Sequence, residues 1–237
     1  SDRRPTNAAH AYRLLRAFIR WTNRKADYLG VVDSSTYNDE EVIKSLPASK
    51  PKNDVLQREQ LATWFGAVRT ISNVVISAYL QGLLLTGARR EELASLRWDD
   101  VDFRWRSITI RDKVEGQRTI PLTPYLSHLL QRLPRHNEWV FSSPSAVNGR
   151  LAEPRKAHTK ALQMAGLPHV SLHGLRRSFG TLSEWCEVPT GVIAQIMGHK
   201  PSALAEKHYR RRPLDLLRMW HDRVESWMLE NAAINFS

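Results

Sequence analysis

Cysteine is almost absent from this chain of 237 residues, with Cys186 as its single example. One cysteine excludes a disulfide within the chain and a metal site built from several cysteines, and it fits the reducing conditions of a cytoplasm. No apolar run approaches the roughly 20 residues that a membrane span requires, and the N-terminus lacks the apolar core of a signal peptide. We therefore expect a cytoplasmic protein with no membrane partner.

Acidic residues are few compared with basic ones. The chain has 24 Asp and Glu against 35 Lys and Arg, which gives a net charge of +11 and a pI of about 10.1. Such an excess favours a nucleic-acid partner, because Lys and Arg release counterions when they neutralise phosphates. An acidic membrane surface would need a clustered basic amphipathic helix, and a basic protein with no specific partner remains an alternative. No carboxylate cluster indicates a two-metal nuclease, so we expect no metal site of that kind.

The composition is that of a folded protein, with 42% hydrophobic and 25% charged residues. Two prolines, small residues and charges between Pro47 and Asp54 predict an extended connector. We therefore predict three parts: residues 1–46, a linker at 47–55, and a large domain at 56–237. The first part is shorter than the roughly 70 residues that usually sustain one core, so we expect it to be the end of a helical domain.

Helical spacing of apolar residues dominates the chain. A helix is predicted over Asn7–Leu29 with Thr6 as its cap, and a short helix is predicted after Asn38, with Asn38 as its cap. Further helices are predicted over 57–68, 74–85, 90–96, 124–132, 155–165, 174–186, 190–197 and 213–229. Two β-rich stretches, 107–110 and 118–120, flank a turn with glycine and predict a hairpin. The predicted fold class is mainly α with one small antiparallel sheet (α+β).

The last predicted helix has an apolar stripe. This stripe predicts docking either on its own domain or on a neighbouring protomer, and the sequence leaves both open. Its members are Leu216, Leu217, Trp220, Val224, Trp227 and Met228.

Arg89 is a candidate phosphate-binding residue. It follows a predicted helix break at Gly87 and precedes another helix, whose first amides favour an anion. A guanidinium binds phosphate through two donors, and Glu92, three residues on, lies on the same helical face and would orient it. The alternative is that Arg89 and Arg90 are solvated surface charges.

Two histidines offer proton-transfer groups. His173 and Arg176 are three residues apart, so in a helix both can face one phosphate, where one moves protons and the other binds charge. His199 follows a predicted helix end. Taken singly, each histidine is more often solvated or satisfied in a core.

Tyr209 is a candidate nucleophile because four basic residues, Arg210 among them, and a histidine surround it. Positive neighbours stabilise a phenolate and attract DNA. The alternative is a tyrosine packed over a helix end. Lys113, at the end of the first hairpin strand, is a candidate acid, although hairpin lysines are usually only exposed.

Together these segments resemble the tyrosine recombinases, the phage-type integrase family. Thr86–Arg89 with Glu92 is similar to its arginine box, and Lys113–Leu122 is similar to its lysine-bearing hairpin. His173–Phe179 is similar to its His-x-x-Arg box and Met197–His199 to its Leu-Gly-His box. Tyr209 stands where the nucleophile follows. Each match alone is common, and the shared order indicates the family. Residues before the linker resemble the end of its DNA-clamping core-binding domain.

The resemblance implies DNA cutting and rejoining through a 3′-phosphotyrosyl intermediate, for integration or excision of a mobile element, without a metal or cofactor. It implies Tyr209 as nucleophile, Lys113 as general acid, and His173 as an aid to proton transfer. It further implies that Arg89, Arg176, His199 and Arg210 bind DNA phosphate. Implied partners are double-stranded DNA, three further copies of the chain in a tetramer, and accessory DNA-bending proteins. The resemblance also implies a protein encoded by a bacterium or a phage that acts on the nucleoid. A type IB topoisomerase and a noncatalytic DNA-binding module are the alternatives.

Overall fold

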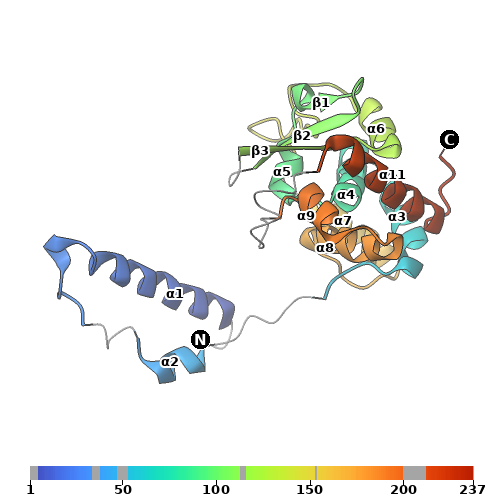
Figure 1. The fold of residues 1–237 in the computed structure, drawn as a ribbon. Helices are drawn as coiled ribbons and strands as arrows, with labels where there is room; N and C mark the ends of the chain where they lie inside the picture. The colour runs from blue at the N-terminus through green and yellow to red at the C-terminus, as the bar shows by residue number, and fades with distance from the viewer. Residues whose placement is uncertain are drawn as a thin grey trace. The chain divides into compact units, whose positions relative to one another are not determined.

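The computed structural model describes residues 5–33, 38–46, 53–112, 116–152, 154–199 and 212–236. It divides into two compact units, Ser1–Lys52 and Asn53–Ser237, which Figure 1 shows as ribbons. Helices form most of the described chain, with one three-stranded antiparallel sheet. The predicted fold class is therefore confirmed. No helix in these ranges is long and apolar enough to cross a membrane.

The first helix is shorter than predicted. Helix α1 runs over Pro5–Thr22, so Thr6 lies inside it and is not its cap, because proline is favoured at a first helical position. The predicted continuation to Leu29 is wrong. Thr22 Oγ1 donates to Ile19 O at 2.8 Å and Asn23 Nδ2 donates to Val32 O at 3.0 Å, and such local bonds compete with helix propagation.

The second helix, α2 (Glu40–Ser45), is capped by Asp39 rather than by the residue predicted. Asp39 Oδ1 accepts from the Glu41 and Val42 amides at 2.8 and 3.1 Å. Asn38 instead turns its Oδ1 to Arg16 and Arg20 of α1, a contact that no local sequence pattern reveals.

In the second unit the predicted helices are confirmed within a few residues of each end, and the hairpin is confirmed. A two-residue strand, β1, and the 3-10 turns of the described chain were not predicted. The α-helices are α3 (Leu61–Arg69), α4 (Val74–Thr86), α5 (Arg90–Ala94), α6 (Pro124–Gln131), α7 (Arg155–Met164), α8 (Leu172–Ser183), α9 (Thr190–Met197) and α11 (Leu214–Asn231). The strands are β1 (Val101–Asp102), β2 (Ser107–Asp112) and β3 (Gly116–Pro121), and the 3-10 turns are Arg58–Gln60, Trp98–Asp100, Glu184–Cys186 and, in the first unit, Ala26–Tyr28.

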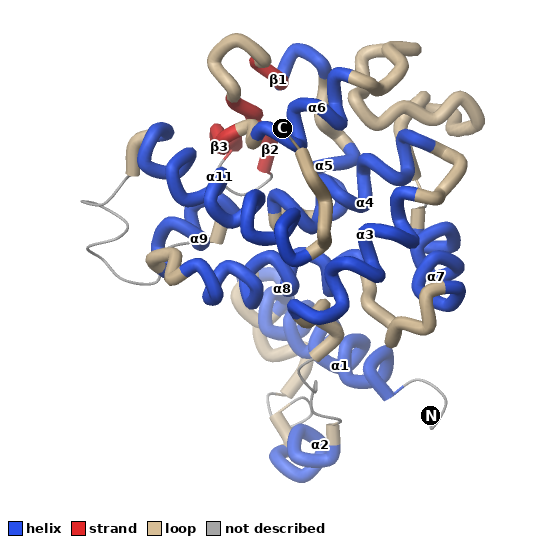
Figure 2. Tube along the Cα trace, turned by 90° about the vertical axis from the view of Figure 1, so that its right-hand side faces the viewer, coloured by secondary structure: helices blue, strands red, loops and turns tan. Residues whose placement is uncertain are grey.

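Helix α4 forms the centre of the second unit (Figures 1 and 2). It is buried on almost every side, and it packs against α3, α5, α6 and α8. Its sequence is apolar all round, which is what a helix surrounded by others requires. Tyr79 packs edge-on against Phe141 with ring centres 5.2 Å apart, and its hydroxyl donates to Arg90 O at 2.7 Å.

The sheet lies at one end of the second unit (Figure 2), with strand order β1-β2-β3. Ile108 pairs with Ile120, and Ile110 pairs with Arg118. Ile108, Ile110 and Ile120 are fully buried. Because alternate residues of a strand face the same side, Arg118 shares the inward face with Ile120.

Helix α11 docks on its own unit. Leu217, Val224 and Met228 are buried there, against α3, α8, α9 and β3, whereas Leu216 is exposed. Glu225 is buried and accepts from the Thr123 hydroxyl and from the Tyr125 and Leu126 amides at the start of α6. The apolar stripe is therefore used within the chain.

Candidate active site

The carbonyl end of α9 is the point at which three of the predicted site residues, Arg89, Arg176 and His199, meet. Helix α9 ends at Met197, and Gly198 closes it in the left-handed region at φ 72°. The last carbonyls of a helix have no partner within the helix. Here arginines from three other elements supply the donors.

Arg89 comes from the turn between α4 and α5. It is the N-cap residue of α5, and its Nη2 donates to Gly198 O at 3.1 Å. Its Nη1 lies 2.5 Å from Glu92 Oε1, and its amide donates to Glu92 Oε2 at 3.0 Å. The side chain of Glu92 is only 8% exposed, against 41% for Arg89. The predicted contact between Glu92 and Arg89 is thus present, with Arg89 open to solvent.

Arg176, on α8, is buried with 4% of its surface exposed. Its Nη1 donates to Gly87 O at 2.6 Å and to Met197 O at 2.8 Å. Gly87 ends α4 at φ 59°, and a Cβ there would lie 2.5 Å from the Phe179 ring. Glycine is required at this turn for its conformation and for space.

Arg118 is a member of the site that the sequence analysis did not identify. Its Nε donates to Ile196 O at 3.1 Å and its Nη2 lies 2.8 Å from Glu92 Oε2. The signal was present in the sequence, because the alternation of β3 places Arg118 in phase with Ile120. An inward arginine among buried isoleucines calls for a specific acidic partner.

The two histidines lie beside these arginines, and both are exposed. His173 is the second residue of α8, and His199 directly follows Gly198, with its amide bonded to Ala194 O at 2.8 Å. Burial of part of each ring, together with nearby arginines, lowers both histidine pKa values below the ordinary 6.5. For His173 the arginines are Arg177, Arg176 and Arg89, with Asp54 opposing them.

For His199 the groups that lower the pKa after burial are Arg176, Arg89, Arg118 and His173, in that order. Each imidazole is consequently neutral at pH 7 and has a ring nitrogen that can accept a proton. We call Arg89, Arg118, Arg176, His173 and His199 the basic cluster.

The start of α8 is held by Asp54, which the sequence analysis assigned to the linker without a role. Asp54 Oδ2 accepts from the Ser171 amide at 2.9 Å, and Oδ1 pairs with Arg177. Burial would raise the pKa of Asp54, but these hydrogen bonds and the Arg177 charge outweigh it and hold the pKa at about 2. A Cβ on Gly174 would lie 2.4 Å from Asp54 O, so this close approach needs glycine.

The predictions for Lys113, Tyr209 and Arg210 concern residues that lie outside the described ranges. Residues on both sides of 200–211 are attached to α9, however. His199 is bonded to Ala194 as above, and Arg212 exchanges two hydrogen bonds with the Gln195 side chain, at 2.9 and 3.1 Å.

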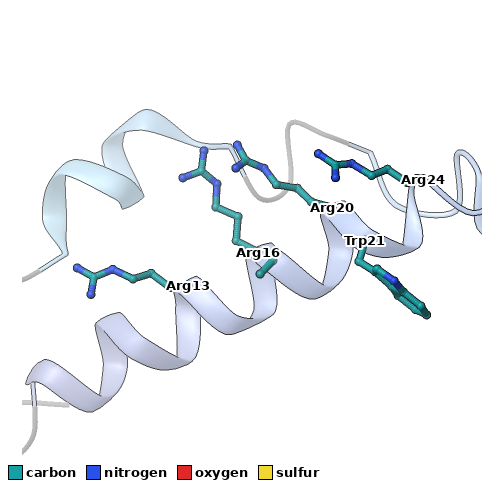
Figure 3. Close-up of a pocket in the computed structure, with 6 residues that line it drawn as sticks. Arg13, Arg16, Arg20, Trp21 and Arg24 are labelled. Carbon is teal, nitrogen blue, oxygen red and sulfur yellow. The ribbon is translucent and has the colours of Figure 1, made fainter. Parts of the chain in front are cut away.

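The first unit has a separate basic surface on α1. Arg13, Arg16 and Arg20 of α1, and Arg24 just after its end, extend to one side in Figure 3. They line a hollow to which Trp21 also contributes. Asn38 Oδ1 accepts from Arg16 at 2.9 and 3.2 Å and from Arg20 at 3.3 Å. Asn38 thereby holds two of the four guanidinium groups in place.

In chemical terms the basic cluster is a site for an anion. Its three arginines and the buried Glu92 carry a net charge of +2, and two neutral imidazoles adjoin them. Hydrogen bonds to carbonyls and to Glu92 fix the guanidinium groups before any ligand arrives, which is the arrangement that stabilises developing negative charge most effectively.

Comparison with known proteins gives the same family for both units. Residues 54–213 match the model of the phage integrase family, and residues 1–44 match the phage integrase core-binding domain. Prophage integrase IntF of Escherichia coli strain K12 is 61% identical over 98% of this chain and 51% of its own length. The chain spans about half the length of the curated relatives it matches.

Two solved structures share the fold at low sequence identity. The integrase from mycobacterium phage Brujita has a TM-score of 0.60 and 20% identity, covering 90% of this chain and 70% of that one. A lambda integrase tetramer bound to a Holliday junction has a TM-score of 0.60 and 15% identity, covering 84% and 60%. With the family model matching more than half of its residues, this chain belongs to the phage integrase family.

Proposed function

We propose that this protein is a site-specific DNA recombinase that cuts and rejoins DNA through a 3′-phosphotyrosyl intermediate, for integration or excision of a mobile element. The observation that carries the proposal is the basic cluster. Residues separated by up to 110 positions in sequence, from Arg89 to His199, converge on one helix end. Membership of the phage integrase family supports DNA strand cleavage and rejoining as the reaction at this anion site.

In the proposed reaction the Tyr209 oxygen attacks the scissile phosphorus, and the bond from phosphorus to the 5′-oxygen breaks. Lys113 gives a proton to the leaving 5′-oxygen. Arg89 and Arg176 stabilise charge on the nonbridging oxygens, His199 donates a hydrogen bond to the phosphate, and His173 accepts and returns the tyrosine proton. Attack by the 5′-hydroxyl of another strand reverses the step, so bond energy is conserved without a cofactor.

The closeness of Tyr209 to Arg212 in sequence supports its proposed role as the nucleophile. Tyr209 precedes Arg212 by three residues, and three residues of chain span at most about 11 Å. Arg212 is hydrogen-bonded to Gln195 of α9, the helix that leads into His199. Arg210 is proposed to contact DNA phosphate next to the nucleophile.

The proposed partner is double-stranded DNA, bound by a tetramer of this protein with accessory DNA-bending proteins. A related lambda integrase was solved as a tetramer on a Holliday junction. We propose residues 1–46 as the C-terminal part of the core-binding domain, 47–55 as linker and 56–237 as catalytic domain. The DNA substrate places the reaction in the cytoplasm of a bacterial host, on its nucleoid.

A covalent trap tests the proposal. The probe is a nicked duplex with the junction sequence at the end of the element that carries the gene, so that cleavage releases a short fragment and leaves the enzyme attached. We expect a denaturant-resistant adduct from the native protein and none from Tyr209→Phe. No adduct from the native protein, or an adduct from Tyr209→Phe, would refute the assignment.

A second measurement separates recombination from topoisomerase activity. Plasmids with two copies of the junction sequence should yield recombinant products. Relaxed supercoils alone would indicate a topoisomerase, and DNA binding with no adduct would indicate a noncatalytic module.

A further inference from the structure

Arg118 is the most deeply placed basic residue of the β2–β3 hairpin in the described chain. Its side chain is 12% exposed, and it shares a face with the fully buried Ile120. Its neighbours along β3, Gln117 and Thr119, are exposed. Moving a guanidinium out of water is costly unless its donors are satisfied, so the position of Arg118 depends on its contacts.

These contacts connect three elements in a closed loop. From β3, Arg118 pairs with Glu92 of α5 at 2.8 Å and donates to Ile196 O of α9 at 3.1 Å. Glu92 in turn holds Arg89 at 2.5 Å, and Arg89 donates to Gly198 O at 3.1 Å. A displacement of Arg118 would therefore move both Arg89 and Gly198, the residue before His199.

Gly198 shows how closely the loop is packed. A Cβ on this glycine would lie 2.7 Å from Arg118 Cζ and Nη1, and its φ of 72° is one that other residues rarely adopt. The guanidinium thus lies directly against the backbone that presents His199.

We propose that Arg118 is a positioning residue for strand cleavage: it fixes the carbonyl end of α9, and with it His199, relative to Arg89 and to the hairpin that carries Lys113. The inference rests on the proposed recombinase function. Arg118 does not contact the reacting phosphate in this proposal. It acts through Glu92 and through the end of α9.

The test compares Arg118→Gln with Arg111→Gln in the full-length protein, with the nicked junction duplex as probe. Arg111 is a matched control, because it lies on the same hairpin and pairs with Asp100 at 2.8 Å, away from the basic cluster. We expect Arg118→Gln to slow adduct formation by roughly 10- to 100-fold, as small misplacements of reacting groups do. Duplex affinity for both variants, and the cleavage rate of Arg111→Gln, should stay within about threefold.

A titration distinguishes positioning from simple support of the fold. Arg118 lowers the His199 pKa, as do Arg176, Arg89 and His173, so loss of Arg118 should raise that pKa, measured from the NMR shifts of the His199 ring. Arg118→Lys keeps the charge and loses the paired contacts. Its His199 pKa should therefore stay near the native value, while its cleavage rate recovers only in part.

Native cleavage rates for folded Arg118→Gln, equal losses for Arg118→Gln and Arg111→Gln, or full recovery in Arg118→Lys would each overturn the inference. If Arg118→Gln does not fold, Arg118→Lys alone decides: a native rate refutes the inference, and a reduced rate at unchanged duplex affinity supports it. Absence of a Tyr209-dependent adduct from the native protein would instead refute the recombinase function.

Discussion

Glu92 places one negative charge between two arginines of the basic cluster. Burial alone would raise its pKa, but hydrogen bonds from Arg118 and Arg89 and the Arg118 charge lower it below the ordinary value. Glu92 therefore stays ionised at neutral pH and orients both guanidinium groups. Arg176 is held by its hydrogen bonds to the carbonyls of Gly87 and Met197.

Hydrogen bonds hold Arg176 in place before DNA binds. Its substitution should therefore lower the cleavage rate more than the DNA affinity. We expect Arg176→Ala to slow adduct formation by about 100- to 1,000-fold, the usual range for loss of one preorganised donor. Duplex affinity should fall much less, because the contact strengthens in the transition state. Single-turnover cleavage and duplex binding, measured on the same variant, check this.

Arg58→Ala serves as the control, since Arg58 lies over the Trp185 ring, 4.9 Å from its centre, and has no contact with the cluster in the described structure. Equal losses of affinity and rate in Arg176→Ala would show that Arg176 only anchors phosphate.

At the scale of elements, α8 depends on a residue from the start of the second unit. Asp54 bonds to the amide of Ser171, the N-cap of α8, and pairs with Arg177 one turn into the helix. These contacts orient the helix that carries His173 and Arg176. The stability they contribute should depend on pH in a defined way.

The folded-state pKa of Asp54 is about 2, against 3.8 for the free group. A depressed pKa means that the stabilisation is complete above 3.8 and is lost as pH falls through about 2. We expect Asp54→Asn to lower the free energy of unfolding by on the order of 2 kcal/mol at pH 7, and by about half of that at pH 3. Urea denaturation at both pH values measures the difference.

The exposed Asp99 provides the comparison, because Asp99→Asn should change the free energy of unfolding by less than about 0.5 kcal/mol at either pH. A deficit in Asp54→Asn that is the same at pH 7 and pH 3 would show that the carboxylate charge is not what stabilises α8.

Prediction of the elements from sequence succeeded where the pattern is local. Apolar spacing and closing glycines located α4 and α9, with Gly87 and Gly198 as their C-caps. The cap of α2 was assigned to Asn38 instead of Asp39, because the competing contact of Asn38 with Arg16 joins residues 22 positions apart. Such contacts leave no trace in a local pattern.

At the scale of the whole molecule, the net charge of +11 should make DNA binding depend strongly on salt. Three arginines of α1, together with Arg24 just after its end, line one surface of the first unit, and we expect them to neutralise phosphates. Changing Arg13, Arg20 or Arg24 singly to glutamine should reduce the slope of log affinity against log salt by about 0.9 each. Fluorescence anisotropy with a random-sequence duplex, at several salt concentrations, measures the slope.

Lys44→Gln is the matched control in the same unit, because Lys44 pairs with Glu40 at 3.1 Å on α2. Its slope should equal that of the native protein. Unchanged slopes in all three arginine variants would exclude this face of α1 from the DNA contact.

The sequence by itself determined the fold class, the positions of most helices, the hairpin, and the candidates Arg89, Lys113, His173, Arg176, His199 and Tyr209. Periodicity, turn residues and motif order are properties of the chain, so they can be read without coordinates. Only the tertiary structure decided that Arg118 joins Glu92 to the end of α9 and that Asp54 holds α8. Those contacts join residues 26 to 123 positions apart, and burial of the intervening core is what brings them together.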